Sequence, residues 1–418
     1  MSNLQSGDGR ALVIGVFAGE PSGDVLGAGL MAALRRRNPG VRFVGVGGPR
    51  MVAEGLSSLV PLQQLSIHGF LEPLLRLPAL LRIFFLVRRA VRAAEVDAFV
   101  GIDFNVFNLL LERSLRRRGI RTVHYVSPSV YAWRRGRVHR VARAADLLLT
   151  LFPFEPPLYS AAGAHAVFVG HPLADEIRGG SDVAAARATL YVEGAPLVVL
   201  LPGSRLSEVR LMGALFVAAA ERLLAVLPNA RFIVPCVNAD VRAHMQACAA
   251  ASGIARHITL VDGRSRLAMA AADAVLVKSG TGTLEALLLE RPMVVAYRLG
   301  FFTAAVVRRL LRTPFVALPN ILAGRQVVPE LLQDAATPSA LADALVAVLT
   351  APDEARETMR GIAASLRRDA SARAAEAVLL LCGASPAAVL DERKGNDEQT
   401  VAGALPRSAQ DRAGSAEE

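Results

Sequence analysis

The sequence is poor in cysteine. Its 418 residues include three cysteines, at positions 236, 248 and 382. No pair of them has metal-ligand spacing, and an odd number in a chain this long excludes a disulfide framework. We therefore expect the protein to work in a reducing, cytoplasmic compartment.

Aromatic residues and the common nucleotide-binding motifs are also scarce. Aromatic residues make up 5% of the chain, with a single Trp, and no nucleic-acid recognition motif is present, which argues against a nucleic-acid partner. The sequence contains no GxGxxG, no GxxxxGK[ST] and no cluster of carboxylates that would hold magnesium. We expect no metal ion and no cofactor.

Lysine is almost absent, although the chain is basic. The net charge is +10, and of 47 basic residues only Lys278 and Lys394 are lysines. A GC-rich genome explains arginine in place of lysine, but it does not explain the excess of positive charge. We expect an anionic partner, such as membrane phosphates or a phosphorylated substrate.

Long uninterrupted hydrophobic runs are missing as well. The run ALVIGVFA at 11–18 is short and leads into GEPSGD, so it predicts a first strand and not a signal peptide. The apolar stretch at 69–87 contains Glu72, Pro73, Arg76 and Arg82, which a membrane-spanning helix would rarely carry together.

What the sequence does contain is a regular alternation of short apolar runs and helical patterns. This alternation predicts an α/β fold with parallel sheets. It breaks off around 174–195 and then restarts, so we expect two doubly wound, Rossmann-like domains, at 9–173 and 187–350. Helices at 351–383 and a disordered tail at 384–418 complete the prediction. The expected strands are Leu12–Phe17, Arg42–Val46, Ala98–Ile102, Thr122–Val126, Leu147–Leu151, Val167–Val169, Leu197–Leu201, Phe232–Pro235, Ile258–Val261, Ala274–Val277 and Met293–Ala296.

The first loop of interest, AGEPSGD at 18–24, follows the first expected strand. Doubly wound sheets bind ligands beyond the carboxyl ends of their strands. Gly23 permits close backbone approach, and Glu20 could accept hydrogen bonds from sugar hydroxyls. Ser22 and Asp24 are equally typical of residues that cap the following helix.

The second loop, LPGSRLSE at 201–208, opens the second half. Gly203 shapes the turn, Ser204 could cap a helix, and Arg205 lies near the N-terminus of that helix. A cation there opposes the helix dipole, which favours an anionic ligand shared by Arg205 and the backbone amides. A solvent-facing Arg205, or one paired with Glu208, is the alternative.

The third loop, SGTGTLE at 279–285, joins an expected strand to an expected helix. Ser279, Gly280, Thr281 and Thr283 are small enough to let a diphosphate reach the helix N-terminus. Glu285 lies about one turn into the helix, where it could bind two ribose hydroxyls. These features favour a nucleotide sugar, and the alternative is an ordinary Gly-Thr turn with a surface Glu.

Several stretches together resemble the lipid-A-disaccharide synthase family. They are AGEPSGD, VGVGGPRM, HYVSPSVYAWRRGR, FVGHP, LPGSR, SGTGTLEALLLERPMVVAYR and LPNILAGR, in order from residue 12 to 382. The resemblance implies a GT-B fold, with two Rossmann-like domains, an active site between them and a C-terminal helix that returns to the first domain. It also implies metal-independent, inverting transfer of 2,3-diacylglucosamine from UDP to 2,3-diacylglucosamine 1-phosphate (lipid X).

The resemblance points to Asp103, in FVGIDFNVFN, as the base for the acceptor hydroxyl, with Glu20 and Asp24 in the same catalytic set. Asn320 matches the family pattern and joins the expected UDP-sugar site. The family usually has Gly-Ile-Asp-x-Pro-Asp-Phe-Asn, so Asn105 and Val106 depart from it, and Gln326 replaces a usual Glu. A structural helix cap is the alternative role for Asp103.

The lipid substrates imply contact with a membrane surface. The stretch 68–94 combines Leu, Ile and Phe with Arg76, Arg82, Arg88, Arg89 and Arg92, which suits peripheral binding to the cytoplasmic face of the inner membrane. Core helices with arginines at the rim are the alternative, favoured for 299–315. Three further arginines, Arg134, Arg135 and Arg137, could meet the phosphate of the acceptor or simply be solvated.

Other functions remain open on the sequence alone. One is a GT-B enzyme that uses a UDP-sugar differently, such as a UDP-sugar epimerase or a transferase to another lipid. Another, suggested by Val106 and Gln326, is a relative that binds UDP-sugar without catalysis. The oligomeric state, including a homo-oligomer, is also open.

Overall fold

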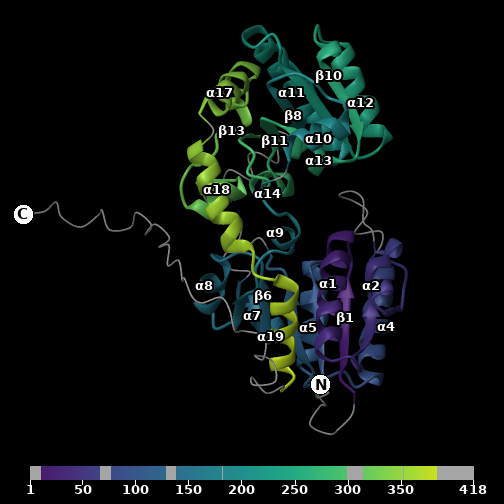
Figure 1. Ribbon diagram of the computed structural model, residues 1–418. Helices are drawn as coiled ribbons and strands as arrows, with labels where there is room; N and C mark the ends of the chain where they lie inside the picture. Colours follow the sequence, from purple (N-terminus) through teal and green to yellow (C-terminus); the bar gives the residue numbers. More distant parts are fainter. Residues whose placement is uncertain are drawn as a thin grey trace, which may run out of the picture.

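The strands of the protein form two separate parallel sheets. The computed structural model describes residues 11–65, 77–128, 138–180, 182–298, 314–351 and 353–383. One sheet has seven strands and the other six. Figure 1 shows them in two units, which we call the first unit (with β1 and α1, purple) and the second unit (with β8 and α11, teal).

In the first sheet the strand order is β3-β2-β1-β4-β5-β6-β7. Every residue of β1 and β4 is buried, as expected for central parallel strands that are covered on both faces. Because β1 pairs with both β2 and β4, the order of the strands reverses between β1 and β4. The strands are β1 (Val13–Ala18), β2 (Arg42–Val46), β3 (Ser57–Ser58), β4 (Ala98–Ile102), β5 (Arg121–Tyr125), β6 (Leu147–Thr150) and β7 (Ala166–Phe168).

Two apolar cores cover the faces of this sheet. Alternate residues of β1 point to opposite faces, so Ile14 packs into one core, with Leu30 of α1, and Phe17 packs into the other, with Val87 of α4. The helices of the first unit are α1 (Pro21–Arg37), α2 (Pro49–Ala53), η1 (Leu62–Gln64), α4 (Leu77–Ala93), α5 (Asn105–Arg116), α7 (Val138–Ala144) and α8 (Glu155–Ser160).

The second sheet repeats the same plan with the order β10-β9-β8-β11-β12-β13. Its order reverses between β8 and β11. The strands are β8 (Leu197–Leu201), β9 (Arg231–Cys236), β10 (Ile258–Asp262), β11 (Ala274–Lys278), β12 (Met293–Tyr297) and β13 (Glu330–Leu332). The helices are α10 (Val183–Leu190), α11 (Leu206–Val226), α12 (Ala239–Ala250), η3 (Ala255–His257), α13 (Ser265–Ala271), α14 (Thr281–Leu288), α16 (Leu318–Ala323), η4 (Gln333–Ala335) and α17 (Pro338–Thr350).

The last two helices connect the units. The helix α18 (Asp353–Leu366) packs on α14 and α16 of the second unit, whereas α19 (Ala370–Leu381) packs on α1 of the first (Figure 1). Ala374 and Val378 of α19 belong to the same core as Leu30 and Met31 of α1. The chain therefore ends by completing the core with which it began.

A short helix, α9 (Pro172–Glu176), binds the segment between α18 and α19, where the chain returns to the first unit. The carboxylate of Asp175 accepts hydrogen bonds from the backbone N–H groups of Arg368 and Asp369, both at 3.0 Å, and of Ala370 at 2.7 Å. The Arg367 guanidinium donates to the carbonyl of Ala174 at 2.9 Å. These contacts tie the start of α19 to the segment that leads from β7 into the second unit.

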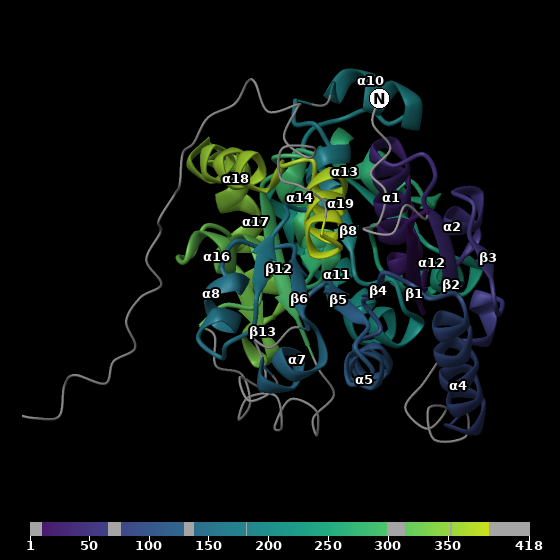
Figure 2. The ribbon, with the colours of Figure 1, turned by 90° about the horizontal axis from the view of Figure 1, so that it is seen from below.

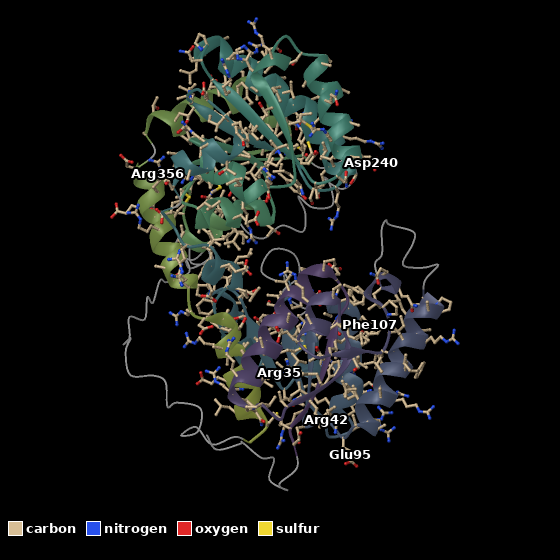
Figure 3. All side chains as sticks on the ribbon, turned by 45° about the vertical axis from the view of Figure 1, so that its right-hand side comes forward. Arg35, Arg42, Glu95, Phe107, Asp240 and Arg356 are labelled. Atoms are coloured by element: carbon tan, nitrogen blue, oxygen red, sulfur yellow. The ribbon has the colours of Figure 1, made fainter. Side chains whose placement is uncertain are left out.

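The carboxyl ends of the first sheet point toward the second unit. Arg42, the first residue of β2, and Glu95, which precedes β4, lie at the end of the first unit away from the second (Figure 3). Phe107, just after the carboxyl end of β4, lies closer to the second unit. The loops that follow β1 and β4 are therefore directed toward the second unit.

The predicted α/β class and the two-sheet GT-B architecture are confirmed, including the C-terminal helix that packs on the first unit. Two short strands were not predicted, β3 and β13. Helix α10 already packs on α13 of the second unit, so the elements of that unit begin before the predicted boundary at 187. The predicted tail and most of 299–315 lie outside the described residues.

Candidate active site

Each of the three loops lies between a strand and a helix, at the points where the strand order reverses. The loop with Glu20 joins β1 to α1, the loop with Arg205 joins β8 to α11, and the loop with Gly280 joins β11 to α14. A fourth loop, with Asp103, joins β4 to α5. Such reversal points are where open α/β sheets bind ligands.

Glu20 links the two units electrostatically. It is the N-cap residue of α1, and its side chain makes no capping hydrogen bond. Partial burial raises the pKa of Glu20, the Asp103 carboxylate raises it further, and Arg205 lowers it. Because Asp103 belongs to the first unit and Arg205 to the second, charged groups of both units act on one carboxylate.

Asp103 lies on a strained turn. Asp103 and Phe104 both have left-handed backbone conformations, with φ values of 50° and 46°. Such conformations are costly for residues other than glycine and are often found at functional sites. The carboxylate of Asp103 is half-buried and accepts a hydrogen bond of 3.1 Å from Nδ2 of Asn105, while its carbonyl accepts one of 2.7 Å from Asn108.

Phe104 explains the glycine at position 19. A Cβ atom on Gly19 would lie 2.5 Å from Cγ of the Phe104 ring, so only glycine leaves room for that ring. Phe104 also stacks near Phe17, with ring centroids 6.2 Å apart. The loops after β1 and β4 are therefore in direct contact.

Asp24 makes structural contacts inside the first unit, and its predicted place in the catalytic set stays a prediction. It is 4% exposed, and its carboxylate accepts hydrogen bonds from the backbone N–H groups of Gly48 at 2.8 Å, Met51 at 3.0 Å and Arg50 at 3.1 Å. Asp24 thereby stabilises the first turn of α2, and both of its oxygens are occupied. In the same loop, Ser22 is exposed and Gly23 is buried against Ala18.

The loop at 201–208 is organised by Glu208. Its Oε2 accepts hydrogen bonds from the N–H groups of Ser204, at 3.2 Å, and Arg205, at 3.5 Å, and its Oε1 lies 2.8 Å from Nζ of Lys278. Burial acts to raise the pKa of Glu208, but Lys278 and the two amides outweigh it and lower the pKa. These two amides are thus occupied within the loop, and their predicted contact with an anionic ligand stays a prediction.

The Arg205 side chain itself is available. It is 80% exposed, with one 3.8 Å contact from Nη1 to Oε1 of Glu208. Gly203, with a φ of 144°, allows the loop to approach α11, because a Cβ there would lie 2.6 Å from Cβ of Glu208. The Lys278–Glu208 pair therefore holds the loop in shape, whereas the exposed Arg205 guanidinium is available to bind a ligand.

The loop at 279–285 leaves the N-terminus of α14 open. A Cβ placed on Gly280, which has a φ of 157°, would meet no atom within 4 Å. Thr281 begins α14 and is exposed. The hydroxyl groups of Ser279 and Thr283 instead donate to backbone carbonyls, of Val316 at 3.1 Å and Gly280 at 2.7 Å. The hydroxyl groups of Ser279 and Thr283 are therefore occupied within the protein, whereas Thr281 and Gly280 border open space.

Glu285 is held by an arginine that the sequence analysis missed. Nε of Arg266 lies 2.9 Å from Oε1 of Glu285, and Nη1 of the same guanidinium lies 3.1 Å from Oε2 of Glu176. This bridge joins α13, α14 and α9, and it fixes the orientation of Glu285. The pairing spans nineteen positions along the chain, so sequence spacing offers no signal for it.

Asn320 makes structural contacts inside the second unit, and its predicted place in the UDP-sugar site stays a prediction. It is fully buried, its Oδ1 accepts from the N–H groups of Val327 at 2.7 Å and Val328 at 2.9 Å, and its Nδ2 donates to Glu330 at 2.7 Å. Gln326 lies beside a cavity of about 240 Å³ that Met293, the first residue of β12, also lines, away from the carboxyl ends of the strands.

Within the described ranges, no group of three or more His, Cys, Asp or Glu side chains could hold a metal ion. In that same part of the chain, no helix is long and apolar enough to cross a membrane. The predicted phosphate contacts Arg134, Arg135 and Arg137 lie outside the described residues. Lys278, a rare lysine just before SGTGT that the sequence patterns did not single out, lies at the end of β11 and pairs with Glu208 of the neighbouring loop.

Comparison with known proteins gives a consistent result. The model of the family described as lipid-A-disaccharide synthetase matches residues 14–379. A lipid-A-disaccharide synthase of Azotobacter vinelandii is 53% identical over 373 residues, which are 88% of this chain and 98% of that protein. One of Pseudomonas putida is 51% identical over 370 residues, with the same shares of the two chains.

Solved structures agree on the fold. A UDP-GlcNAc 2-epimerase of Neisseria meningitidis bound to UDP-GlcNAc has a TM-score of 0.57 at 13% identity, over 88% of this chain and 98% of that one. The glycotransferase of kitacinnamycin has a TM-score of 0.56 at 16% identity, over 89% and 99%. At these identities the likeness concerns the fold alone. The family match and the close relatives go further, and they show that this chain belongs to the lipid-A-disaccharide synthase family of glycosyltransferases.

Proposed function

We propose that the protein transfers 2,3-diacylglucosamine from UDP-2,3-diacylglucosamine to lipid X, forming the β-1,6-linked disaccharide 1-phosphate and UDP. The observation that carries this proposal is the position of the loops with Glu20 and Asp103 at the reversal point of the first sheet, whose carboxyl ends are directed toward the second unit with Arg205 (Figure 3). A candidate base of the first unit and a candidate phosphate-binding group of the second unit would then act at one site, which the influence of both Asp103 and Arg205 on the pKa of Glu20 supports. A transferase that joins two sugars needs both groups there.

In the proposed reaction, Asp103 accepts the proton of the acceptor 6-hydroxyl. The hydroxyl oxygen then forms a bond to C1 of the donor sugar, on the face opposite UDP, as the bond from C1 to the diphosphate oxygen breaks. The electron pair of the new bond comes from the hydroxyl oxygen, and the electron pair of the broken bond stays on the diphosphate oxygen of UDP. The configuration at C1 is therefore inverted.

The second unit would stabilise the charge that develops on UDP. Arg205 offers an exposed guanidinium, and the open N-terminus of α14 offers the backbone N–H groups around Gly280 and Thr281. Glu285, oriented by Arg266, is suited to accept hydrogen bonds from the ribose hydroxyls. Glu20 would accept hydrogen bonds from the hydroxyls of the sugar.

We also propose that an exposed apolar face of the first unit binds the cytoplasmic surface of the inner membrane. Leu77, Leu81 and Phe85 are spaced four residues apart on α4 and are 50%, 49% and 53% exposed. On α5, which contacts α4 and lies with it on the side of the first sheet opposite α1 (Figure 2), Val106 and Leu110 are 75% and 59% exposed. We call these five residues the apolar face.

Positive charge borders this face. The Arg88 guanidinium lies 4.9 Å from the centroid of the Phe85 ring. Arg82 and Arg89 are exposed on the same helix. Apolar side chains beside arginines suit an interface with anionic lipid headgroups, where both substrates would reside.

One assay tests the proposed reaction. Purified protein is mixed with detergent-dispersed UDP-2,3-diacylglucosamine and lipid X, without added metal, and UDP and the disaccharide 1-phosphate are followed by mass spectrometry. We expect both products in equal amounts. UDP without the disaccharide would indicate hydrolysis or a different acceptor. If the protein binds UDP but forms neither product, the alternative of a non-catalytic UDP-sugar-binding relative would replace the proposal.

A further inference from the structure

Two fully buried ionisable side chains lie behind the candidate active site. Glu112 of α5 and His124 of β5 are both 0% exposed, and Oε1 of Glu112 lies 2.7 Å from Nδ1 of His124. Burial raises the pKa of Glu112, and the charge and hydrogen bond of His124 counteract part of that effect. A Cβ atom on Gly101 would collide with Glu112, so the backbone of β4 leaves room for this pair.

Asn105 connects this buried pair to Asp103. Its Oδ1 lies 3.0 Å from Nε2 of His124, and its Nδ2 lies 3.1 Å from Oδ1 of Asp103. Asn105 is the first residue of α5, next to the strained turn at Asp103 and Phe104. A continuous chain of hydrogen bonds thus runs from the buried Glu112 to the carboxylate of Asp103.

The chemistry of these groups fixes the direction of the two hydrogen bonds that Asn105 makes. An ionised carboxylate only accepts hydrogen bonds, so the NH₂ group of Asn105 must face Asp103. The amide oxygen of Asn105 then faces His124 and requires a proton on Nε2. A second proton lies between Nδ1 of His124 and Glu112, so the buried pair is neutral overall, whichever of the two atoms holds it.

We propose that Asn105 is a positioning residue, which His124 and Glu112 hold in place so that its amide orients the carboxylate of Asp103. The inference rests on the proposed function, because it takes Asp103 as the proton acceptor. Within the described part of the chain, Asn105 makes the one side-chain hydrogen bond to the Asp103 carboxylate. That bond occupies Oδ1 and leaves Oδ2 for the acceptor hydroxyl.

The first test compares Asn105→Ala with wild-type protein in the synthase assay. We expect kcat to fall about 10- to 100-fold, because a misplaced reacting group costs that much, while KM for the UDP-sugar changes less than about twofold. Alanine suits the first turn of a helix, so the variant should fold. The matched control is Asn38→Ala, which removes a buried amide at the far end of the same unit and should lower Tm without lowering kcat.

The second test needs no substrate. Protein labelled with ¹⁵N at its seven histidines is compared by NMR with the same preparation of Asn105→Ala. We expect the signal of one histidine to change, and in wild-type protein that histidine should carry its proton on Nε2. No changed histidine signal, or a changed one with an unprotonated Nε2, would overturn the inference.

The two tests separate this inference from the proposed function. A wild-type protein that forms no disaccharide would contradict the proposed function, and the spectra would still decide whether Asn105 bonds to His124. An active wild type with kcat of Asn105→Ala within about twofold would overturn the positioning role alone.

Discussion

The side chains of Asp103 and Asp24 are chemically identical, and their surroundings separate their roles. Asp24 is buried and binds three backbone N–H groups, whereas Asp103 is half-buried and lies on a strained turn at the point where the strand order reverses. A carboxylate with both oxygens occupied cannot accept a proton from a substrate without losing those bonds. A carboxylate with one free oxygen can.

The substitution Asp103→Asn is nearly isosteric and removes the proton acceptor. We expect kcat to fall about 100- to 10,000-fold, because general base catalysis contributes that much. UDP binding by calorimetry and the melting temperature should stay close to wild type. Asp24→Asn provides the contrast, since it places an NH₂ group against N–H donors and should lower Tm. Near-normal turnover in Asp103→Asn would exclude Asp103 as the base.

Asn320 is expected to matter for stability and not for UDP binding. Replacement by Ala leaves the N–H groups of Val327 and Val328 and the carboxylate of Glu330 without this partner inside the protein. Unpaired buried groups cost about 1–3 kcal/mol each, so we expect a loss of unfolding free energy of about 2–4 kcal/mol. Urea denaturation measures the loss, and calorimetry with UDP measures any change in Kd. A weaker Kd with unchanged stability would return Asn320 to the UDP site.

Two buried groups should give the protein opposing pH dependences. Burial raises the pKa of Glu155 to about 7 and lowers the pKa of His171 to about 4. Folded Glu155 binds its proton more tightly than the unfolded chain does, so its contribution to stability is lost as pH rises from 4.5 to 7. His171 binds its proton less tightly when folded, so its contribution is lost as pH falls from 6.5 to 4.

Single variants should reveal each effect. Glu155→Gln removes the titrating carboxyl group. The free energy of unfolding of this variant, relative to that of wild type, should therefore rise by about 3 kcal/mol as pH rises from 4.5 to 7. His171→Asn keeps an acceptor for the Leu173 N–H and should gain relative to wild type as pH falls. Chemical denaturation at half-unit pH steps measures both. Differences from wild type that do not vary with pH would contradict the assignment.

Among the helices, α4 and α5 carry the clearest signal of a surface function. Exposed apolar residues that occur singly are normal, but the apolar face combines five of them on two adjacent helices. Phe84 and Phe107 join these helices, with ring centroids 5.9 Å apart, so the face is presented by a packed pair of helices.

The double variant Leu81→Glu, Phe85→Glu should bind vesicles poorly. We expect co-sedimentation with vesicles of anionic phospholipid to fall at least about tenfold, since two apolar contacts are lost and two negative charges are added. Leu211→Glu is the matched control, because Leu211 is 48% exposed, as Leu81 is 49% exposed, but lies on α11 of the second unit. Equal losses in the double variant and in the control would contradict a specific membrane face.

The cap that α9 provides to α19 should set the stability of the connection between the units. Asp175→Ala removes three hydrogen bonds to the start of α19, and we expect a loss of about 1–2 kcal/mol and faster hydrogen exchange over 370–381. Asp369→Asn is the control, because Asp369 makes no side-chain capping bond and asparagine accepts its φ of 53°. Unchanged exchange over α19 in Asp175→Ala would show that packing alone holds the helix.

Local pattern explains which parts of this architecture the sequence could predict. The strands β2, β4 and β8 have the predicted bounds because each is a short, mainly apolar run between helices. The strands β3 and β13 were missed because they have two and three residues, and Ser57 and Glu330 give no apolar signal. The ligand-binding loops at the strand ends were predicted because clusters of Gly, Ser and Thr between a strand and a helix are typical of close backbone approach to a ligand.

Pairings between distant residues explain what could not be predicted. Asn320 and Asp24 stabilise backbone segments that only the folded chain brings beside them, and in the sequence they resemble ligand-binding residues. The bonds of Lys278 to Glu208 and of His124 to Glu112 join residues on different elements. Periodicity identifies the elements, but it does not tell which polar side chains will meet.

For the molecule as a whole, the position of α19 has a consequence for synthesis on the ribosome. Ala374 and Val378 fill the core against Leu30 and Met31, yet they are made more than three hundred residues later. The newly made first sheet must therefore wait, with one face of α1 uncovered, until nearly the entire chain has emerged. A nascent chain that stalls in the second unit would leave the core-facing side of α1, with Leu30 and Met31, exposed, and it would become a substrate for chaperones and proteases.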